Sequence, residues 1–189
     1  MSAAKISDND RRLACMIRPG LVSQVDYVNA LVRVKLGDAE SAWLPWLVTR
    51  AAGDRTWSAL EVGEQVLVLS PSGDTRMGYV LGSIYRASFP APASSADVST
   101  TVYGDGASVS YDRAAHAYSI DVPGGGTVKA TAGDAYAEVA SEKVTLAVGS
   151  SKIEVSSSGI VLTCGGTALN LSSGGATLAA ASASGFENH

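Results

Sequence analysis

A short alternation of apolar and small polar residues recurs along the second half of this chain and limits what that half can fold into. From Ile120 onward, apolar pairs or triplets at every second position begin about eight or nine residues apart, with Gly, Ser or Asp between the groups. Alternation with period two is typical of strands with one buried face, and the interruptions are typical of tight turns. The pattern therefore predicts an internal repeat of short strand plus tight turn.

The apolar groups are short and the segments between them carry little charge. The groups are Val109/Tyr111, Ile120/Val122, Val128/Ala130, Ala137/Val139, Val144/Leu146/Val148, Ile153/Val155, Ile160/Leu162/Cys164, Leu169/Leu171 and Leu178. Between Glu154 and Glu187 there is no ionised side chain. Strands of this kind must bury their apolar face to be soluble.

Three architectures could bury that face. A β-sandwich requires sequence-distant pairings and larger core residues than Val, Thr and Ala. A β-helix from one chain requires on the order of 20 residues per coil, which gives only about four coils here. The third is an intertwined triple-stranded β-helix, in which every strand pairs with strands of other chains and the apolar residues face a three-fold axis.

The composition favours the intertwined trimer. A narrow interior suits Val, Ile, Leu, Ala and Thr, and no Trp occurs after Trp57. Pairing between chains would also leave no exposed strand edge along the needle. The other interpretation, a disordered Ser/Gly/Ala tail, is disfavoured by the regular β-branched positions.

The first half of the chain predicts a different module. Ser7 or Asp8 is placed to cap one helical turn that ends near Leu13. Five strands follow, and Pro45 predicts an edge or a bulge in the third of them. The predicted strands cover residues 16–26, 29–37, 41–50, 64–70 and 76–85. Five strands in about 75 residues fit a small closed Greek-key barrel of the OB type.

The two halves of the chain differ in net charge, and the net charge limits the partners that each half can bind. Residues 1–90 hold ten Lys and Arg and nine acidic residues, while residues 91–189 hold four and nine, so the halves carry +1 and −5. No basic face for nucleic acid is expected from these charges. The aromatic side chains of the barrel could stack on bases, but without an electrostatic attraction we interpret them as core or as facing a partner subunit. They are Trp43, Trp46, Trp57 and Tyr79.

These observations give a domain organisation for an all-β chain. We expect an N-terminal lead at 1–14, an OB-type barrel at 15–87, a Pro/Ala/Ser linker at 88–97, a trimeric β-helix needle at 98–180 and an apex at 181–189. Cys15 and Cys164 are interpreted as reduced thiols, and no secretory signal or membrane helix is recognisable.

The stretch GEQVLVLSPSGDTRMGYVLGSIY, from Gly63 to Tyr85, carries a resemblance to a known family. Together with the linker and the low-charge repeat, it resembles the central spike (baseplate assembly protein V) of contractile phage tails, a group that includes the spike of R-type pyocins. The resemblance covers nearly the whole chain in domain order. It implies a homotrimer at the tail tip of a virion or pyocin particle, assembled in the host bacterial cytoplasm.

The resemblance also implies partners and a mode of action. The barrels would attach to the baseplate hub protein, and the needle would be driven through the outer membrane of the target cell when the sheath contracts. Some relatives carry a lysozyme domain between barrel and needle, and the short linker at 88–97 leaves no room for one. No nucleic-acid partner is expected.

The last three residues are candidates for a metal site. Members of this family often end in His-X-His, which binds one iron on the axis, whereas this chain ends in Glu187-Asn188-His189. Alternation places Glu187 and His189 on one face, so three copies would give three nitrogen and three oxygen ligands, suited to octahedral Fe²⁺ or a similar transition metal ion. Two alternatives are that Glu187 caps the site through hydrogen bonds and that His189 frays.

No constellation in the sequence predicts an enzyme. Asp105, Asp112 and Asp121 are spaced as turn residues, and the GGGT stretch at 124–127 lacks the context of a phosphate loop. The alternative function is a receptor- or glycan-binding trimeric tail protein, which would require a groove with aromatic residues and paired acids. A second alternative is an OB-type nucleic-acid module with a trimerising tail.

Overall fold

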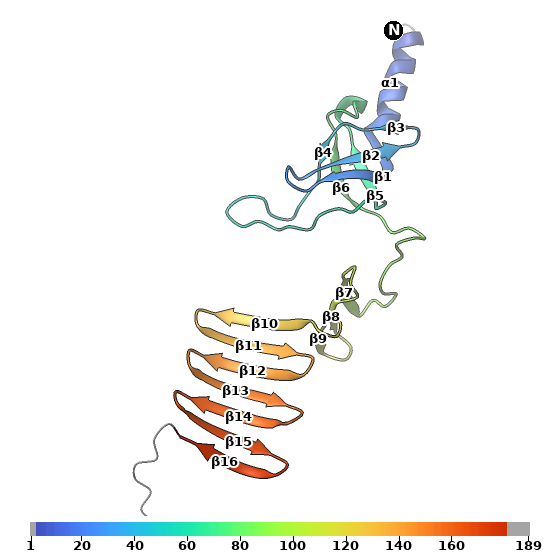
Figure 1. The fold of residues 1–189 in the computed structure, drawn as a ribbon. Coiled ribbons are helices and arrows are strands. Elements are labelled where there is room, and N and C mark those ends of the chain that lie inside the picture. Colours follow the sequence, from blue (N-terminus) through green and yellow to red (C-terminus); the bar gives the residue numbers. More distant parts are fainter. Residues whose placement is uncertain (1–2, 181–189) are drawn as a thin grey trace, which may run out of the picture. The chain divides into compact units, whose positions relative to one another are not determined.

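The structure is a computed structural model that describes residues 3–180, and the chain in it is mainly β (Figure 1). It divides into two compact units, Met1–Ala91 and Pro92–His189. The boundary between the units falls inside the predicted linker at 88–97. Each unit is described below by itself.

The first unit begins with helix α1 (Ala3–Met16), which is longer than the single turn predicted from the sequence. Asp8 is not a cap but lies inside the helix, where its carboxylate pairs with Arg11 and Arg12 at 2.8 Å each. Partners three and four residues apart lie on one helix face, so these pairs support the helical turns on either side. The helix leads directly into the first strand.

The first unit contains a six-stranded antiparallel sheet in the order β3-β2-β1-β5-β6, with β4 beside β2. Its strands are β1 (Ile17–Asp26), β2 (Leu31–Leu36), β3 (Ala39–Glu40), β4 (Leu44–Pro45), β5 (Gln65–Leu69) and β6 (Tyr79–Ser83). A short 3₁₀ segment, η1 (Pro71–Gly73), lies between β5 and β6. Four predicted strands match β1, β2, β5 and β6. The predicted strand at 41–50 is reduced to two residues that end at Pro45, because proline has no N–H to continue the ladder.

Within residues 3–180, the hydrogen-bonded strand pairs do not close into the predicted barrel. Only an isolated parallel bridge between Trp46 and Val80 joins the β4 segment to β6, with the Leu47 N–H donating to the Val80 carbonyl at 2.8 Å. The sheet nevertheless encloses one apolar core. Its buried residues are Val22, Val32, Val34, Leu36, Leu44, Leu60, Val66, Val68 and Val80.

The second unit opens with a three-stranded antiparallel meander, β7 (Val98–Val102), β8 (Ser108–Asp112) and β9 (Ala117–Asp121). The apolar groups at Val109 and Ile120 lie in β8 and β9, where they are directly opposite each other. Strand β7 lies outside the predicted apolar groups, because its sequence VSTTV has an apolar residue only at each end.

A seven-stranded antiparallel meander follows, in strict chain order from β10 to β16. Its strands are β10 (Thr127–Ala132), β11 (Ala135–Ala140), β12 (Lys143–Val148), β13 (Ser151–Ser156), β14 (Gly159–Cys164), β15 (Thr167–Ser172) and β16 (Gly175–Ala179). Strands of six residues, or five in β16, and two-residue turns produce the repeat predicted from the sequence. At alternate turns, Gly133, Gly149 and Gly165 have φ near +55°, which a primed hairpin turn requires at its first loop residue.

The pairing of these strands corrects one prediction. Each strand pairs with the next strand of the same chain, so that Leu146 lies opposite Ile153 and Ile153 lies opposite Leu162. Strands β11 to β15 thus have chain neighbours on both sides, and the expectation of an intertwined helix with every strand paired to other chains is wrong for them. The two-residue turns explain this, because they return the chain at once beside the strand it has just left.

Candidate interaction surfaces

The seven-stranded sheet separates its side chains into an apolar and a polar face. Residues directly opposite each other in an antiparallel ladder project from the same face. The register therefore assigns to one face, here called the apolar face, three rows of side chains that run across the strands.

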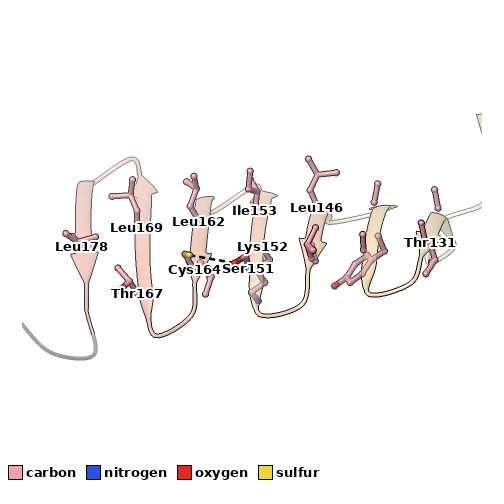
Figure 2. A pocket seen from close by; sticks show the side chains of 18 residues that line it. Thr131, Leu146, Ser151, Lys152, Ile153, Leu162, Cys164, Thr167, Leu169 and Leu178 are labelled. Atoms are coloured by element: carbon pink, nitrogen blue, oxygen red, sulfur yellow. Dashed lines mark hydrogen bonds between the residues drawn. The ribbon is translucent and has the colours of Figure 1, made fainter.

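The three rows differ in side-chain size. The middle row consists of Ala130, Ala137, Leu146, Ile153, Leu162, Leu169 and Leu178. The large row consists of Val128, Val139, Val144, Val155, Ile160, Leu171 and Ala176. The small row consists of Ala132, Ala135, Val148, Ser151, Cys164 and Thr167. Figure 2 shows Leu146, Ile153, Leu162 and Leu169 of the middle row aligned across neighbouring strands, with Ser151, Cys164 and Thr167 in a row beside them.

The apolar face is uncovered in the single chain. Leu146 exposes 51% of its surface, and Val148 and Leu178 expose 65% each. An open hollow of about 810 Å³ lies along the sheet (Figure 2). Residues of the middle and small rows line it, together with residues of the opposite face: Thr131, Tyr136, Ala147, Lys152 and Thr163. Exposed apolar side chains gathered on one face are typical of a protein interface.

The opposite face, here called the polar face, carries a network of ion pairs on β10 to β13. Lys129 pairs with Glu138 at 3.2 Å, and Glu154 accepts from Lys143 at 3.1 Å and from Lys152 at 2.6 Å. Hydrogen bonds from Lys152 and Lys143 lower the pKa of Glu154 below its ordinary value. The bond to Glu154 in turn raises the pKa of Lys143.

These long side chains cover smaller residues of the same face. Thr145 lies between Glu138 and Glu154 in the ladder and is only 3% exposed, and Ala147 on the same strand is 8% exposed. The two residues are buried without a second layer, because charged side chains can lie along a surface while their heads remain in water. The polar face is thus suited to solvent, and the apolar face is not.

The aromatic residues of the first unit do not form one platform. Trp46 packs partly against the core, and its ring centroid is 5.6 Å from that of Trp57 at an interplanar angle of 58°. The guanidinium of Arg33 lies over Trp43 at 5.3 Å from the ring centroid. The core interpretation therefore holds for Trp46, whereas Trp57 is 61% exposed and Tyr79 is also exposed.

The predicted metal ligands Glu187 and His189 lie outside the described residues. Within residues 3–180, no group of three or more His, Cys, Asp or Glu side chains could hold a metal ion. His116 lies in the turn after β8 at φ +53°. Cys164 lies on the apolar face, as its place in the alternation predicted, and its thiol is 3.7 Å from the Ser151 hydroxyl.

Sequence reasoning missed the ion pairs of the polar face. A signal was present, since a hairpin turn centred on residues 133–134 places Lys129 opposite Glu138. The apolar alternation alone does not predict which polar residues lie opposite each other. In the part of the chain that the structure describes, no helix combines the length and the apolar content needed to cross a membrane.

Comparison with known proteins gives the class of the first unit. Residues 18–85 match the family described as the Type VI secretion system/phage-baseplate injector OB domain. The spike protein of Escherichia phage P2 is 36% identical over 149 residues, which cover 76% of this chain and 70% of the phage protein. The chain therefore belongs to the family of phage baseplate spike proteins, and the resemblance inferred from Gly63–Tyr85 is confirmed.

Proposed function

We propose that this protein is a structural, non-enzymatic, homotrimeric spike at the tip of a contractile tail or pyocin, driven through the outer membrane of the target cell when the sheath contracts. The observation that supports it best is the uncovered apolar face of β10–β16 in a chain of the spike family. A piercing device needs stiffness and a closed core, and three copies of this face turned towards one axis provide both.

The dimensions of the sheet suit a three-sided prism. A six-residue strand spans roughly 20 Å, so the axis of a triangle with this side lies roughly 6 Å from each sheet. That distance is close to the reach of a Leu side chain, and the middle row presents Leu146, Leu162 and Leu169 to the axis. All three polar faces, with their ion pairs, would then face solvent.

The first unit supports a place in the baseplate. Its match to an injector OB domain suggests that it attaches the spike to the baseplate hub protein. The particle would then be a phage virion or a pyocin, assembled in the host bacterial cytoplasm, with the second unit directed at the target membrane.

The apex is proposed to hold a transition metal ion such as iron. Glu187 and His189 are two positions apart, and three chains would offer three imidazole nitrogens and three carboxylates. Nitrogen and oxygen donors in this number suit an octahedral divalent ion. The metal would tie the three chain ends together.

Light scattering coupled to size exclusion tests the trimer, and elemental analysis of the same peak tests the metal. We expect a mass of three chains that survives dilution, with about one metal ion per three chains. Loss of the metal in the variant His189→Ala, with the mass unchanged, would assign the ion to the apex. A mass of one chain would overturn the proposed spike, and a metal-free trimer would overturn only the metal site.

A further inference from the structure

The two outer rows of the apolar face differ in size on most strands of the seven-stranded sheet. Strand β13 has Val155 in the large row and Ser151 in the small row, and β14 has Ile160 and Cys164. The same contrast holds for Val139 against Ala135 on β11. Outer rows of equal size would have sufficed if the face had only to be apolar.

The sheet itself gives no reason for this difference. The middle row separates the two outer rows on every strand, so residues such as Ile160 and Cys164 do not fill one another's space. Members of both rows are exposed in the single chain, including Val148 at 65% and Val139 at 53%. The difference in size therefore points to what covers the face.

We propose that the large row of one chain packs against the small row of the next chain at each corner of the trimer. This inference rests on the proposed trimeric spike and adds the order in which its three sheets meet. When three identical sheets face one axis, each corner brings one end of a strand against the opposite end of the neighbouring chain's strand.

The corner is the narrowest part of such a prism, because two sheets converge there. Two bulky side chains at one height would collide, and two small ones would leave a void, both of which cost stability. Pairing Ile160 with Cys164, or Val155 with Ser151, keeps the filled volume nearly even along the stack. A two-fold arrangement of two chains, by contrast, could place large rows together, which would concentrate the volume at one edge and leave the other empty.

The native thiol of Cys164 makes the arrangement testable by disulfide formation. In a Cys15→Ser background, the variant Ile160→Cys would place a second thiol at the height of Cys164 of the neighbouring chain. Each chain then bears one thiol for each neighbour, so oxidation should give covalent trimers on a non-reducing gel. A chain that met its neighbour about a two-fold axis would give covalent dimers only.

Two controls use the same strand and the same thiol. Val161→Cys projects from the polar face beside Ile160 and should stay monomeric on the gel after oxidation. Ile160→Cys combined with Cys164→Ser should also give no covalent product. The second large-row variant, used if Ile160→Cys fails to assemble, is Val155→Cys combined with Ser151→Cys and Cys164→Ser, which places both thiols at one height on β13.

The outcomes separate this inference from the proposed function. Covalent trimers in Ile160→Cys that vanish with Cys164→Ser support the pairing of large and small rows. A covalent product that persists with Cys164→Ser shows that large rows meet one another and overturns the pairing. So does a complete lack of cross-linking in both large-row variants when light scattering still gives three chains. A wild-type mass of one chain overturns the trimeric spike itself.

Discussion

At the scale of single residues, Gly20 on β1 leaves less room for a side chain than any other described glycine of the first unit. A methyl group there would come within 2.7 Å of the Lys35 carbonyl oxygen and 2.8 Å of a Leu36 methyl, and it would also contact Val34. Two of these neighbours are fully buried core side chains, so they have no room to move away. Glycine is required here for the close approach of β1 and β2 rather than for its conformation.

We therefore expect Gly20→Ala to destabilise the first unit by about 1–3 kcal/mol, the usual cost of overpacking a core. All three Trp residues lie in this unit, so urea unfolding followed by Trp fluorescence reports on it directly. Gly82→Ala is the matched control, since Gly82 also lies in a strand but has no atom within 4 Å of the added methyl. Equal stability of the two variants would contradict this account of Gly20.

At the scale of elements, the ion pairs across β12 and β13 make the stability of the sheet depend on pH. Glu154 has a lowered pKa because Lys152 and Lys143 both donate to it. A carboxylate with a lowered pKa stabilises the fold above its ordinary value of 4.5, and this contribution is lost as the pH falls through the lowered pKa. The side chains of its partners Lys143 and Lys152 are 49% and 42% exposed, so salt should weaken the effect.

We expect the unfolding temperature to fall between neutral pH and about pH 3, and to fall less in the variant Glu154→Gln. Circular dichroism of the β signal measures this directly at low ionic strength. Glu142→Gln, in the turn after β11, is the control and should keep the full wild-type difference. If the two variants lose the same number of degrees on acidification, the ion pair has no part in the pH dependence.

The strands of the second unit show which features of the fold can be predicted from the sequence. The alternation from Val128 to Leu178 predicted short strands, their spacing along the chain and the face on which each apolar residue lies, because a strand has a side-chain period of two. It did not predict the partner of each strand, because a strand with one apolar face can pair within the chain or between chains without changing its pattern. Strand β7 and the two-residue β3 have too few apolar residues to give a pattern.

At the scale of the whole molecule, the sequence predicted the family and an apolar face for the trimer, but not how large and small side chains are arranged across that face. The stretch Gly63–Tyr85 was sufficient for the resemblance, which the match at residues 18–85 confirms. The three rows of the apolar face required the register of the sheet, since the sizes of Ile160 and Cys164 matter only once they are known to lie at opposite ends of one strand. The apical residues Glu187 and His189 remain a prediction.

A charge placed on the apolar face should have little effect on a single chain but a large effect on the proposed trimer. Ile153 lies in the middle row and is 40% exposed in the single chain, so Ile153→Asp would cost an isolated sheet little. In the proposed trimer, three carboxylates would instead meet near the axis, without partners and with like charge, a burial that costs several kcal/mol per ion. We therefore expect Ile153→Asp to abolish the trimer, as measured by light scattering.

Thr163→Asp provides the matched comparison, because it adds the same charge on the neighbouring strand but on the polar face, where Thr163 lies opposite Lys152. That variant should keep a mass of three chains and unfold within a few degrees of the wild type, since its carboxylate stays in water next to an ammonium group. If Ile153→Asp also kept the trimeric mass, the apolar face could not be the surface turned towards the axis. The three sheets would then have to meet through some other part of the chain.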